Sequence, residues 1–344
     1  MNCDSDPKTR TRFSKRLLQK LLLSGIVFLL CGVALELTLR MMGYGNLEVY
    51  LSDTKLFWRL KPNQDCYTKI DHKPVHINSN GTRGPEFEVK KPAGTIRILS
   101  LGDSRTFGWG LTDEETYSRR LQNLVQKYVG NGRKVEVINA GVNAWSYPQI
   151  LVYLREYGLR YQPDYVILAE ANYWTQFSEK SSPEFARQFM RRVWLKNFLR
   201  RFAIYHYFIE VKQRVAYEQQ RTKFIPVDPQ SDTLFKEQQQ ADPEALFRNS
   251  VEGICALSLS NHVKPVVLFL PTLDNLTTTN RISVIEVKRA ACEKYTVPLV
   301  DLTANLRARG KELYLDADPV HYNARGNAII ADRIFEALTN SIEK

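Results

Sequence analysis

Cysteine and histidine are scarce in this sequence, and neither is spaced as in a common metal-binding motif. The five cysteines lie far apart along the chain, at Cys3, Cys31, Cys66, Cys255 and Cys292. No two of them form a C-x-x-C pair and no histidine follows at a zinc-ligand spacing, so we do not expect a zinc site. A disulfide among the last three remains open, although an odd number of cysteines is more typical of buried free thiols.

The sequence also lacks a general excess of basic residues, although its formal net charge is +11. Residues 1–20 contain six Lys or Arg and two Asp, and residues 184–223 contain ten basic and three acidic residues. These two segments account for the whole excess, because the other residues contain 32 of each kind. We therefore do not expect the body of the protein to bind nucleic acid.

Nothing in the composition indicates disorder or a collagen-like repeat. Of 344 residues, 44% are hydrophobic and 25% are charged, so the chain can bury a sizeable core. We found no internal repeat. One compact domain with an appendage fits this length.

Long uncharged runs are absent except near the N-terminus, where residues 21–35 read LLLSGIVFLLCGVAL behind a basic arm. This run predicts one transmembrane helix over residues 21–39, with Lys20 and Glu36 near its two ends. The positive-inside rule places residues 1–20 in the cytoplasm and the rest outside it, which is the periplasm in a Gram-negative cell. The alternatives are a cleaved signal ending near Ala34, lipid attachment to Cys31 and a helix buried in a core.

From residue 95 onward, apolar runs alternate with helical patterns. We expect strands at residues 96–102, 135–141, 165–171, 266–271 and 298–302, and helices at 114–128, 147–161, 281–295 and 323–342. Alternation of this kind predicts a parallel sheet with helices on both faces, and ligands of such sheets bind beyond the carboxyl ends of the strands. Residues 41–94, which are rich in turn formers, are expected to lead into this domain of residues 95–344.

A basic insertion interrupts the alternation at about residues 174–246. A long helix is expected to begin with Ser182 as N-cap and Pro183 at the first helical position. Aromatic and apolar residues recur in it at near-helical spacing, at Phe185, Phe189, Val193, Phe198, Phe202 and Tyr205, with arginines between them. Three arrangements fit this pattern: the apolar stripe packs inward beneath a solvated basic face, the helix lies on anionic lipid, or it binds an acidic substrate. Residues 226–242 are expected to form a loop.

Two short motifs carry the residues of a hydrolytic site. Gly102-Asp103-Ser104 follows the first expected strand, which places a hydroxyl at the ligand-binding edge of the sheet. Asp318 precedes His321 by three residues before the last helix, so its carboxylate can orient the imidazole that would accept the Ser104 proton.

With these motifs the chain resembles the SGNH or GDSL-like hydrolases over about residues 95–340. INSNGTRGPE, residues 77–86, is similar to a stretch in membrane-tethered bacterial members. The resemblance implies a three-layer, flavodoxin-like α/β fold, no metal or organic cofactor, and Ser104 as nucleophile with His321 as base and Asp318 as its orienter. It also implies an oxyanion hole formed by Asn172 and the N–H groups of Ser104 and Ala144.

Two blocks depart from the family pattern. Ala144 stands where the family has Gly, with Gly141 three residues earlier, and Ala can supply the same N–H only where φ is not positive. Glu170 and Tyr173 replace a Gly and an Asp around Asn172. Their bulk could reshape the pocket, or Glu170 could simply pair with an Arg at the sheet edge.

We interpret the chain as a membrane-anchored serine esterase acting on an acylated glycan or lipid, for example by removing O-acetyl groups. Transfer of the acyl group to a sugar is one alternative, and a catalytically silent binding or assembly module is another. Five aromatic residues near the motifs could stack on a sugar ring or belong to the core: Phe107, Trp109, Trp145, Tyr173 and Trp174.

Overall fold

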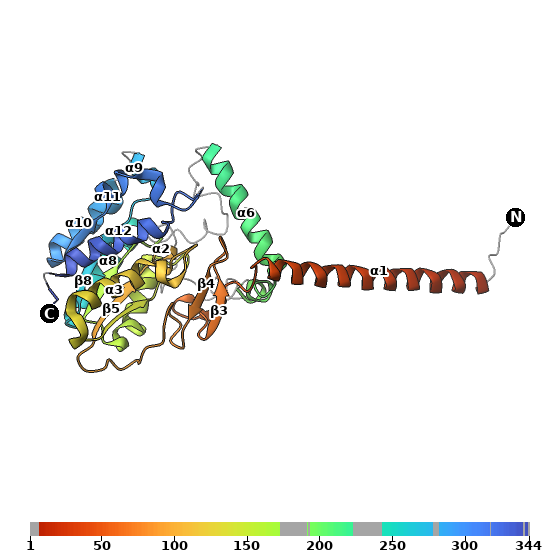
Figure 1. The fold of residues 1–344 in the computed structure, drawn as a ribbon, viewed down its shortest axis with the longest axis horizontal. Coiled ribbons are helices and arrows are strands. Elements are labelled where there is room, and N and C mark those ends of the chain that lie inside the picture. Colours follow the sequence, from red (N-terminus) through yellow and green to blue (C-terminus); the bar gives the residue numbers. More distant parts are fainter. Residues whose placement is uncertain are drawn as a thin grey trace.

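The computed structural model describes residues 7–172, 191, 193–222, 243–277, 282–316, 318–339 and 341–342. Its centre is a five-stranded parallel sheet with the strand order β6-β5-β7-β8-β9 (Figure 1). The strands are β5 (Ile96–Leu101), β6 (Val135–Asn139), β7 (Tyr165–Leu168), β8 (Lys264–Phe269) and β9 (Leu299–Asp301). This order, in which the first strand lies between the second and the third, confirms the predicted flavodoxin-like fold class.

Helices cover both faces of the sheet, which explains why its strands are apolar without alternation. All six residues of β5 are buried, and so are all five of β6. One face carries α4 (Tyr147–Glu156), α8 (Pro243–Ser260) and α10 (Ile282–Tyr295), and the other carries α3 (Tyr117–Val129) and α12 (Ala324–Thr339). Short helices complete the connections: α2 (Ser104–Phe107), α9 (Leu273–Thr277), α11 (Thr303–Arg307), and the 3-10 turns Asp113–Glu115, Gly130–Gly132, Gly158–Tyr161 and Gly310–Leu313.

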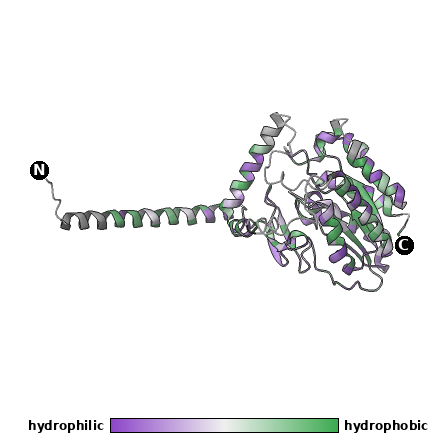
Figure 2. Cartoon of the chain, turned by 180° about the vertical axis from the view of Figure 1, so that it is seen from behind, coloured by the Kyte–Doolittle hydropathy of each residue, from purple (hydrophilic) through white to green (hydrophobic). Residues whose placement is uncertain are grey.

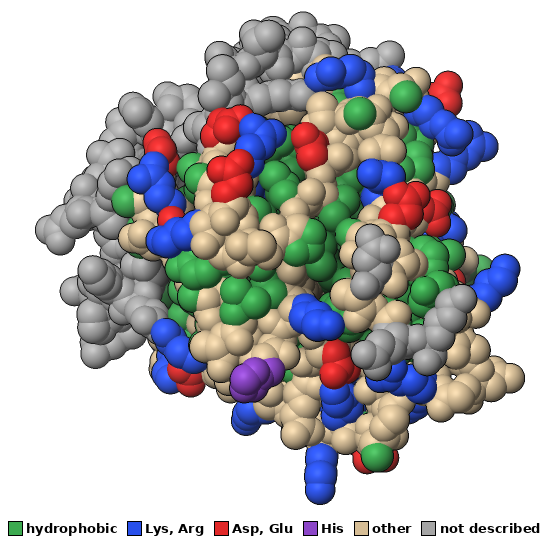
Figure 3. Space-filling model, turned by 90° about the vertical axis from the view of Figure 1, so that its left-hand side faces the viewer, with side chains coloured by type: hydrophobic (Ala, Val, Ile, Leu, Met, Phe, Trp, Pro, Cys, Tyr) green, Lys and Arg blue, Asp and Glu red, His purple; other side chains and the backbone are tan. Residues whose placement is uncertain are grey.

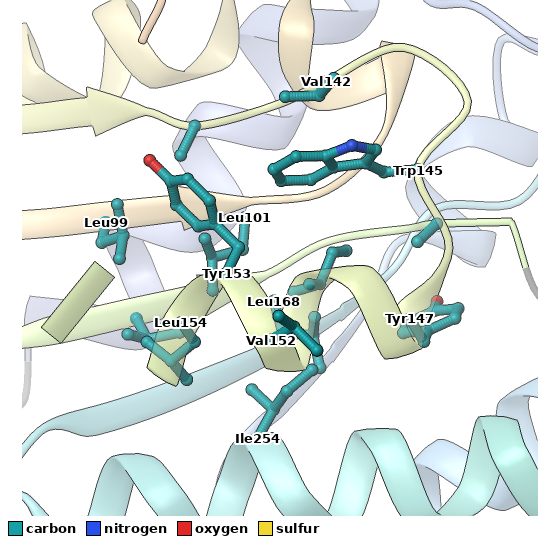
Figure 4. Packing of buried hydrophobic residues seen from close by; sticks show 14 of the residues in the cluster. Leu99, Leu101, Val142, Trp145, Tyr147, Val152, Tyr153, Leu154, Leu168 and Ile254 are labelled. Carbon is teal, nitrogen blue, oxygen red and sulfur yellow. The ribbon is translucent and has the colours of Figure 1, made fainter. Parts of the chain in front are cut away.

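The core beneath α4 is continuous with the sheet and with α8. Figure 4 shows Trp145 and Tyr153 between the sheet and α4, and Ile254 of α8 below Val152 on the other side of α4. The Trp145 ring lies 5.2 Å from that of Tyr153, and its indole N–H donates to the Trp58 carbonyl at 3.0 Å. Cys66, Cys255 and Cys292 are buried free thiols, and burial raises the pKa of Cys255 to about 12. Cys3 lies outside the described residues.

Residues 41–94 form two antiparallel hairpins that pack on the domain. They consist of β1 (Tyr50–Asp53) with β2 (Phe57–Leu60), and β3 (Gln64–Tyr67) with β4 (Pro74–Ile77). Leu56, Trp58, Val75 and Ile77 belong to the same buried cluster as the sheet residues. The hairpins therefore share the core of the domain that follows them.

A single long helix, α1 (Pro7–Met41), projects away from the domain (Figure 1). Its segment Leu17–Met41 is the one helix among the described residues that is long and apolar enough to cross a membrane, and its middle is hydrophobic in Figure 2. Twenty-five residues rising 1.5 Å each give about 37 Å, which exceeds the roughly 30 Å hydrocarbon core of a bilayer.

The basic insertion differs from the expected single helix. Residues 193–199 are helical, the helix breaks at 200–202, and α6 (Ala203–Thr222) begins afterwards. The break has a local cause, because the Glu36 carboxylate of α1 accepts the N–H groups of Ala203 and Ile204 and so caps a new helix start. Ser182, Pro183, Phe185, Phe189 and the expected loop at 226–242 lie outside the described residues.

The predicted inward packing of the insertion's apolar stripe is wrong for two of its four described members, Phe198 and Phe202. Val193 is buried, but Phe198 is 49% exposed and Phe202 is 40% exposed. Beyond the insertion, α8 begins at Pro243 and forms the crossover to β8. This helix is not among those predicted from the sequence.

Candidate active site

Ser104 lies at the carboxyl end of β5, as the first residue of α2. Asp103 caps this short helix, because its side chain accepts the Arg105 N–H at 2.9 Å and pairs with the Arg105 guanidinium at 2.7 Å. Gly102 is required by close packing, since a Cβ there would lie 2.1 Å from the Thr106 hydroxyl. The Gly-Asp-Ser triplet therefore builds a tight strand-to-helix turn that leaves the Ser104 hydroxyl at the edge of the sheet.

The end of β6 supports the same turn from behind. A Cβ on Gly141 would lie 2.2 Å from the Phe107 backbone nitrogen, so only glycine allows this approach. The Asn139 amide donates to the Thr106 carbonyl at 2.8 Å, and the Gly141 N–H donates to the Asn139 side chain at 3.1 Å. Because its N–H is already used, Gly141 packs the turn and does not supply an oxyanion donor.

Arg83, within the INSNGTRGPE stretch, clamps the other end of α2. Its buried guanidinium donates to the carbonyls of Phe107 and Gly108, both at 2.8 Å, and to that of Leu111 at 2.6 Å. The Asp113 carboxylate holds the same guanidinium at 2.6 Å. The sequence motif singles out this stretch. It does not predict that Arg83 donates to the backbone carbonyls at the end of the helix that begins with Ser104.

His321 faces Ser104 from the loop before α12. Its Nε2 lies 2.8 Å from the Ser104 hydroxyl oxygen, and its Nδ1 lies 2.7 Å from an Asp318 carboxylate oxygen. The other Asp318 oxygen accepts the N–H groups of Val320 and His321. Burial alone would raise the pKa of Asp318, but the His321 side chain and these hydrogen bonds lower it. Asp318 is thus an ionised carboxylate fixed against the imidazole.

Trp109, which follows α2, packs on the His321 ring. The two rings are nearly parallel, with an interplanar angle of 18° and centroids 5.3 Å apart. The Lys69 ammonium, from the loop between β3 and β4, lies 4.5 Å from the centroid of the Trp109 ring. This stack restrains the imidazole, and sequence reasoning had not assigned that role to Trp109.

The expected oxyanion residues flank Ser104 on neighbouring loops. Within the described part of the chain, the Ser104 and Ala144 N–H groups donate no hydrogen bond, so both are open to a ligand. Ala144 adopts φ 63°, so the condition that φ is not positive at this position fails. The family's glycine would take this left-handed conformation without strain, whereas Ala adopts it at a cost of about 1–2 kcal/mol. The Asn172 N–H donates to the Trp145 carbonyl at 2.9 Å, which ties this strand end to the Ala144 loop.

Glu170 points into the interior and not into the site, so its predicted effects on the pocket are wrong. It is 3% exposed, and its carboxylate pairs with Lys288 at 2.5 Å and accepts the Tyr147 hydroxyl at 2.8 Å. It also accepts the Leu270 N–H at 3.0 Å. The partner is a buried lysine of α10 and not the arginine that we expected.

The proposed sugar-stacking role is wrong for two of the five aromatic residues. Phe107 is 1% exposed and Trp145 is fully buried, so both belong to the core. Trp109 is occupied by His321 and Lys69. Tyr173 and Trp174 lie outside the described residues.

Comparison with known proteins gives structural likeness only. No family model and no curated protein sequence matches the chain. The fold is similar to TesA, with a TM-score of 0.46 and 12% identity over 72% of this chain and 99% of that one. It is also similar to a mutant of the acetyl-xylooligosaccharide esterase Axe2 from Geobacillus (TM-score 0.46, 14% identity, 72% and 95%). A third is the lipase/acylhydrolase from Enterococcus faecalis (TM-score 0.42, 17% identity, 72% and 97%).

Proposed function

We propose that the protein is a membrane-anchored serine esterase that removes an acyl group with Ser104, His321 and Asp318. The observation that carries this proposal is the unbroken chain of contacts from the Ser104 hydroxyl to His321 Nε2 at 2.8 Å, and from His321 Nδ1 to Asp318 at 2.7 Å. A hydroxyl becomes a nucleophile at neutral pH when an imidazole nitrogen accepts its proton and a carboxylate accepts the other ring N–H. A silent binding module would have no need of this alignment.

In the first half of the reaction, the Ser104 oxygen attacks the ester carbonyl carbon and His321 Nε2 accepts the hydroxyl proton. His321 then gives that proton to the leaving alcohol oxygen as the ester C–O bond breaks, which leaves the acyl group on Ser104. Water repeats the sequence, with His321 taking its proton and returning it to Ser104 as the carboxylic acid leaves. Asp318 stays ionised and holds the imidazole in the required tautomer.

The negative charge that develops on the carbonyl oxygen needs donors within about 3 Å. We assign the N–H groups of Ser104 and Ala144 and the Asn172 side chain to this task. The two backbone groups are supported by their lack of other partners among the described residues. The Ala144 conformation is supported as a functional one because a strained φ at a site edge commonly positions a group for catalysis.

We further propose that α1 crosses the membrane with the basic arm in the cytoplasm and the domain outside it. The exposed apolar surface of Leu17–Met41 supports this, as does the exposed apolar stripe of α6 beside it, formed by Ile204, Tyr207, Phe208, Val211 and Val215. Contacts between α1 and α6 place this stripe near the outer end of the span (Figure 1). The opposite side of the domain instead carries interspersed charges of both signs (Figure 3), which suits contact with water.

The substrate class that follows is an acyl ester at the outer surface of the membrane, on a glycan or a lipid. Topology can be tested with protease added to intact spheroplasts. The domain after α1 should be digested, whereas its full protection would reverse the orientation. A mature N-terminus near Leu35 would replace the anchor with a cleaved signal.

The catalytic proposal is tested by covalent labelling of the full chain in detergent with a fluorophosphonate probe. Wild type should label and should hydrolyse p-nitrophenyl acetate. Ser104→Ala should lose both, because no acyl-enzyme can form. Ser52→Ala, an exposed serine of β1, is the matched control and should keep both. Equal labelling of Ser104→Ala and wild type would overturn the proposal.

A further inference from the structure

A second cluster of imidazole and carboxylate groups lies away from Ser104, where the β3–β4 loop meets α6 and the end of α1. The side chains of His72, His206 and Glu210 place their ligating atoms within 4.8 Å of one another. We propose that these three residues bind one transition-metal ion of the Zn²⁺ type, which fastens α6 to the hairpin. The proposal does not depend on esterase activity.

The buried imidazole of His206 gives the strongest indication that a ligand binds here. Its side chain is fully buried, and its Nε2 has no hydrogen-bond partner among the described residues. Its Nδ1 lies 3.2 Å from the Gly45 carbonyl oxygen. Metal-bound histidines commonly donate the second ring N–H to a backbone carbonyl, which turns the lone pair of the other nitrogen toward the metal. The same Nδ1 is 3.2 Å from the Gly45 N–H, so the metal would select the tautomer that donates.

His72 is presented by a strained turn. Asp71 and His72 both adopt left-handed φ values, 62° and 47°, which residues with a Cβ rarely do in succession. The Tyr44 ring packs on the His72 ring, with centroids 3.9 Å apart. The turn and Tyr44 together hold the His72 imidazole over Glu210, with which its Nε2 interacts directly. A strained turn of this kind persists where surrounding contacts fix it and is often found at binding sites.

Glu210 completes the donor set from α6. It is 3% exposed, and one of its oxygens faces His72 while the other accepts Arg214 at 2.7 Å. Because Arg214 holds one oxygen, Glu210 would bind through the other.

The chemistry of the donors selects the class of metal. Two imidazoles and one carboxylate are a ligand set that Zn²⁺ uses, whereas Mg²⁺ and Ca²⁺ prefer oxygen ligands throughout. Each Zn–N bond is about 2.0–2.1 Å, so the three groups would draw together by small side-chain movements. His206 and Glu210 are four residues apart on one helix face, which is the only trace of the site in the sequence, since His72 lies far away along the chain.

The test uses the untagged full chain in detergent, stripped with a chelator and titrated with Co²⁺, a coloured substitute for Zn²⁺. We expect one equivalent to bind with the visible absorption of a low-coordinate Co²⁺ site. Zn²⁺ should displace it and raise the Tm of the protein by about 3 °C or more. His206→Ala and His72→Ala should lose the absorption and the shift. His76→Ala is the matched control, because His76 lies on β4 but is paired with Asp65 outside the cluster.

Two further measurements are the Co²⁺ affinity of Glu210→Gln and the fluorophosphonate labelling of the variants. Glu210→Gln retains the shape of the side chain without its charge and should weaken Co²⁺ affinity at least 10-fold, so it serves if an alanine variant fails to fold. Absence of stoichiometric Co²⁺ or Zn²⁺ binding by wild type would overturn the proposal. Unchanged affinity in folded His206→Ala would overturn it too. Retention of fluorophosphonate labelling in the variants would show that Ser104 chemistry is separate from this site.

Discussion

Two regions of this molecule combine imidazole with carboxylate, and they differ in where the ring nitrogens point. At the carboxyl edge of the sheet, both nitrogens of His321 are used in a line from Asp318 to Ser104. At the junction of α1, α6 and the hairpins, one nitrogen of His206 contacts a backbone group, and the other has no partner among the described residues. A linear arrangement draws a proton away from a nucleophile, whereas a convergent one suits a shared cation.

The two regions also differ in what holds them. The edge is fixed by the strand ends and by Arg83, and the side chains of Ser104 and His321 are half-buried there. The junction is fixed by buried charges, with Glu48 held by Lys69 at 3.2 Å and by Arg200 at 3.4 Å. Lys69 also lies over Trp109, and the Asn143 amide donates to Glu48 at 3.1 Å beside Ala144. These two contacts connect the junction to the site.

The largest effect should come from the edge. We expect His321→Ala to lower kcat/KM for p-nitrophenyl acetate by about 10⁴- to 10⁶-fold and Asp318→Asn by about 10⁴-fold, because the base or its tautomer is lost. Neither change removes core packing, so the Tm should move little. A calorimetric scan alongside the kinetics checks this. If activity fell only as far as the Tm fell, the edge would act on stability as the junction does, and the prediction would be contradicted.

The next effect should be on stability and should come from the junction. Burial tends to raise the pKa of Glu48, but Lys69 and Arg200 lower it from 4.5 to about 2. The unfolded carboxylate therefore takes up a proton first as pH falls, and the ion cluster contributes fully above about pH 4.5 and is lost toward about pH 2. This loss amounts to at most about 3 kcal/mol, since burial also lowers the pKa of Lys69.

Glu48→Gln tests this assignment by denaturant unfolding of the full chain at pH 7 and at pH 3. The variant should be about 3 kcal/mol less stable at pH 7, because two buried cations lose their partner, and its stability should change less between the two pH values. Glu88→Gln, an exposed glutamate, is the control and should keep the wild-type pH dependence. Parallel curves for Glu48→Gln and wild type would contradict the prediction.

The residues of the catalytic edge could be predicted from the sequence, whereas the contacts at the junction of α1, α6 and the hairpins could not. Apolar runs mark the five strands, and Asp318 and His321 are close in the chain, so the fold and the triad hypothesis followed from local patterns. Glu170–Lys288 and His72–Glu210 join residues far apart in the sequence, and no local pattern records such pairs. The break before α6 was missed for the same reason, because its cap comes from Glu36 of α1. The positive φ of Ala144 could be suspected only from the glycine at this position in the family that the motifs resemble.

A smaller effect on activity should follow from Arg83, the residue that fastens the end of α2. Arg83→Met leaves three carbonyls without their donor, and we expect kcat to fall about 10-fold because Ser104 is then less precisely held. KM should change less than kcat, since Arg83 does not lie at the reacting atoms. Arg289→Met, at an exposed ion pair, is the control. A change confined to KM would place Arg83 in substrate binding instead of positioning.

The smallest effect concerns the strained Ala144 at the edge. Ala144→Gly relieves a left-handed φ that costs about 1–2 kcal/mol, but glycine adds about 0.5–1 kcal/mol of chain entropy to the unfolded state. The net gain in the free energy of unfolding should therefore be about 0.5 kcal/mol, measured by denaturant titration. The N–H group is kept, so kcat should stay within about twofold of wild type if that group is the oxyanion donor. Ala93→Gly, at a loop residue whose own φ is not positive, should instead be neutral or slightly destabilising. A stability loss in Ala144→Gly equal to that control would show that residue 144 bears no strain and that this edge is relaxed around its nucleophile.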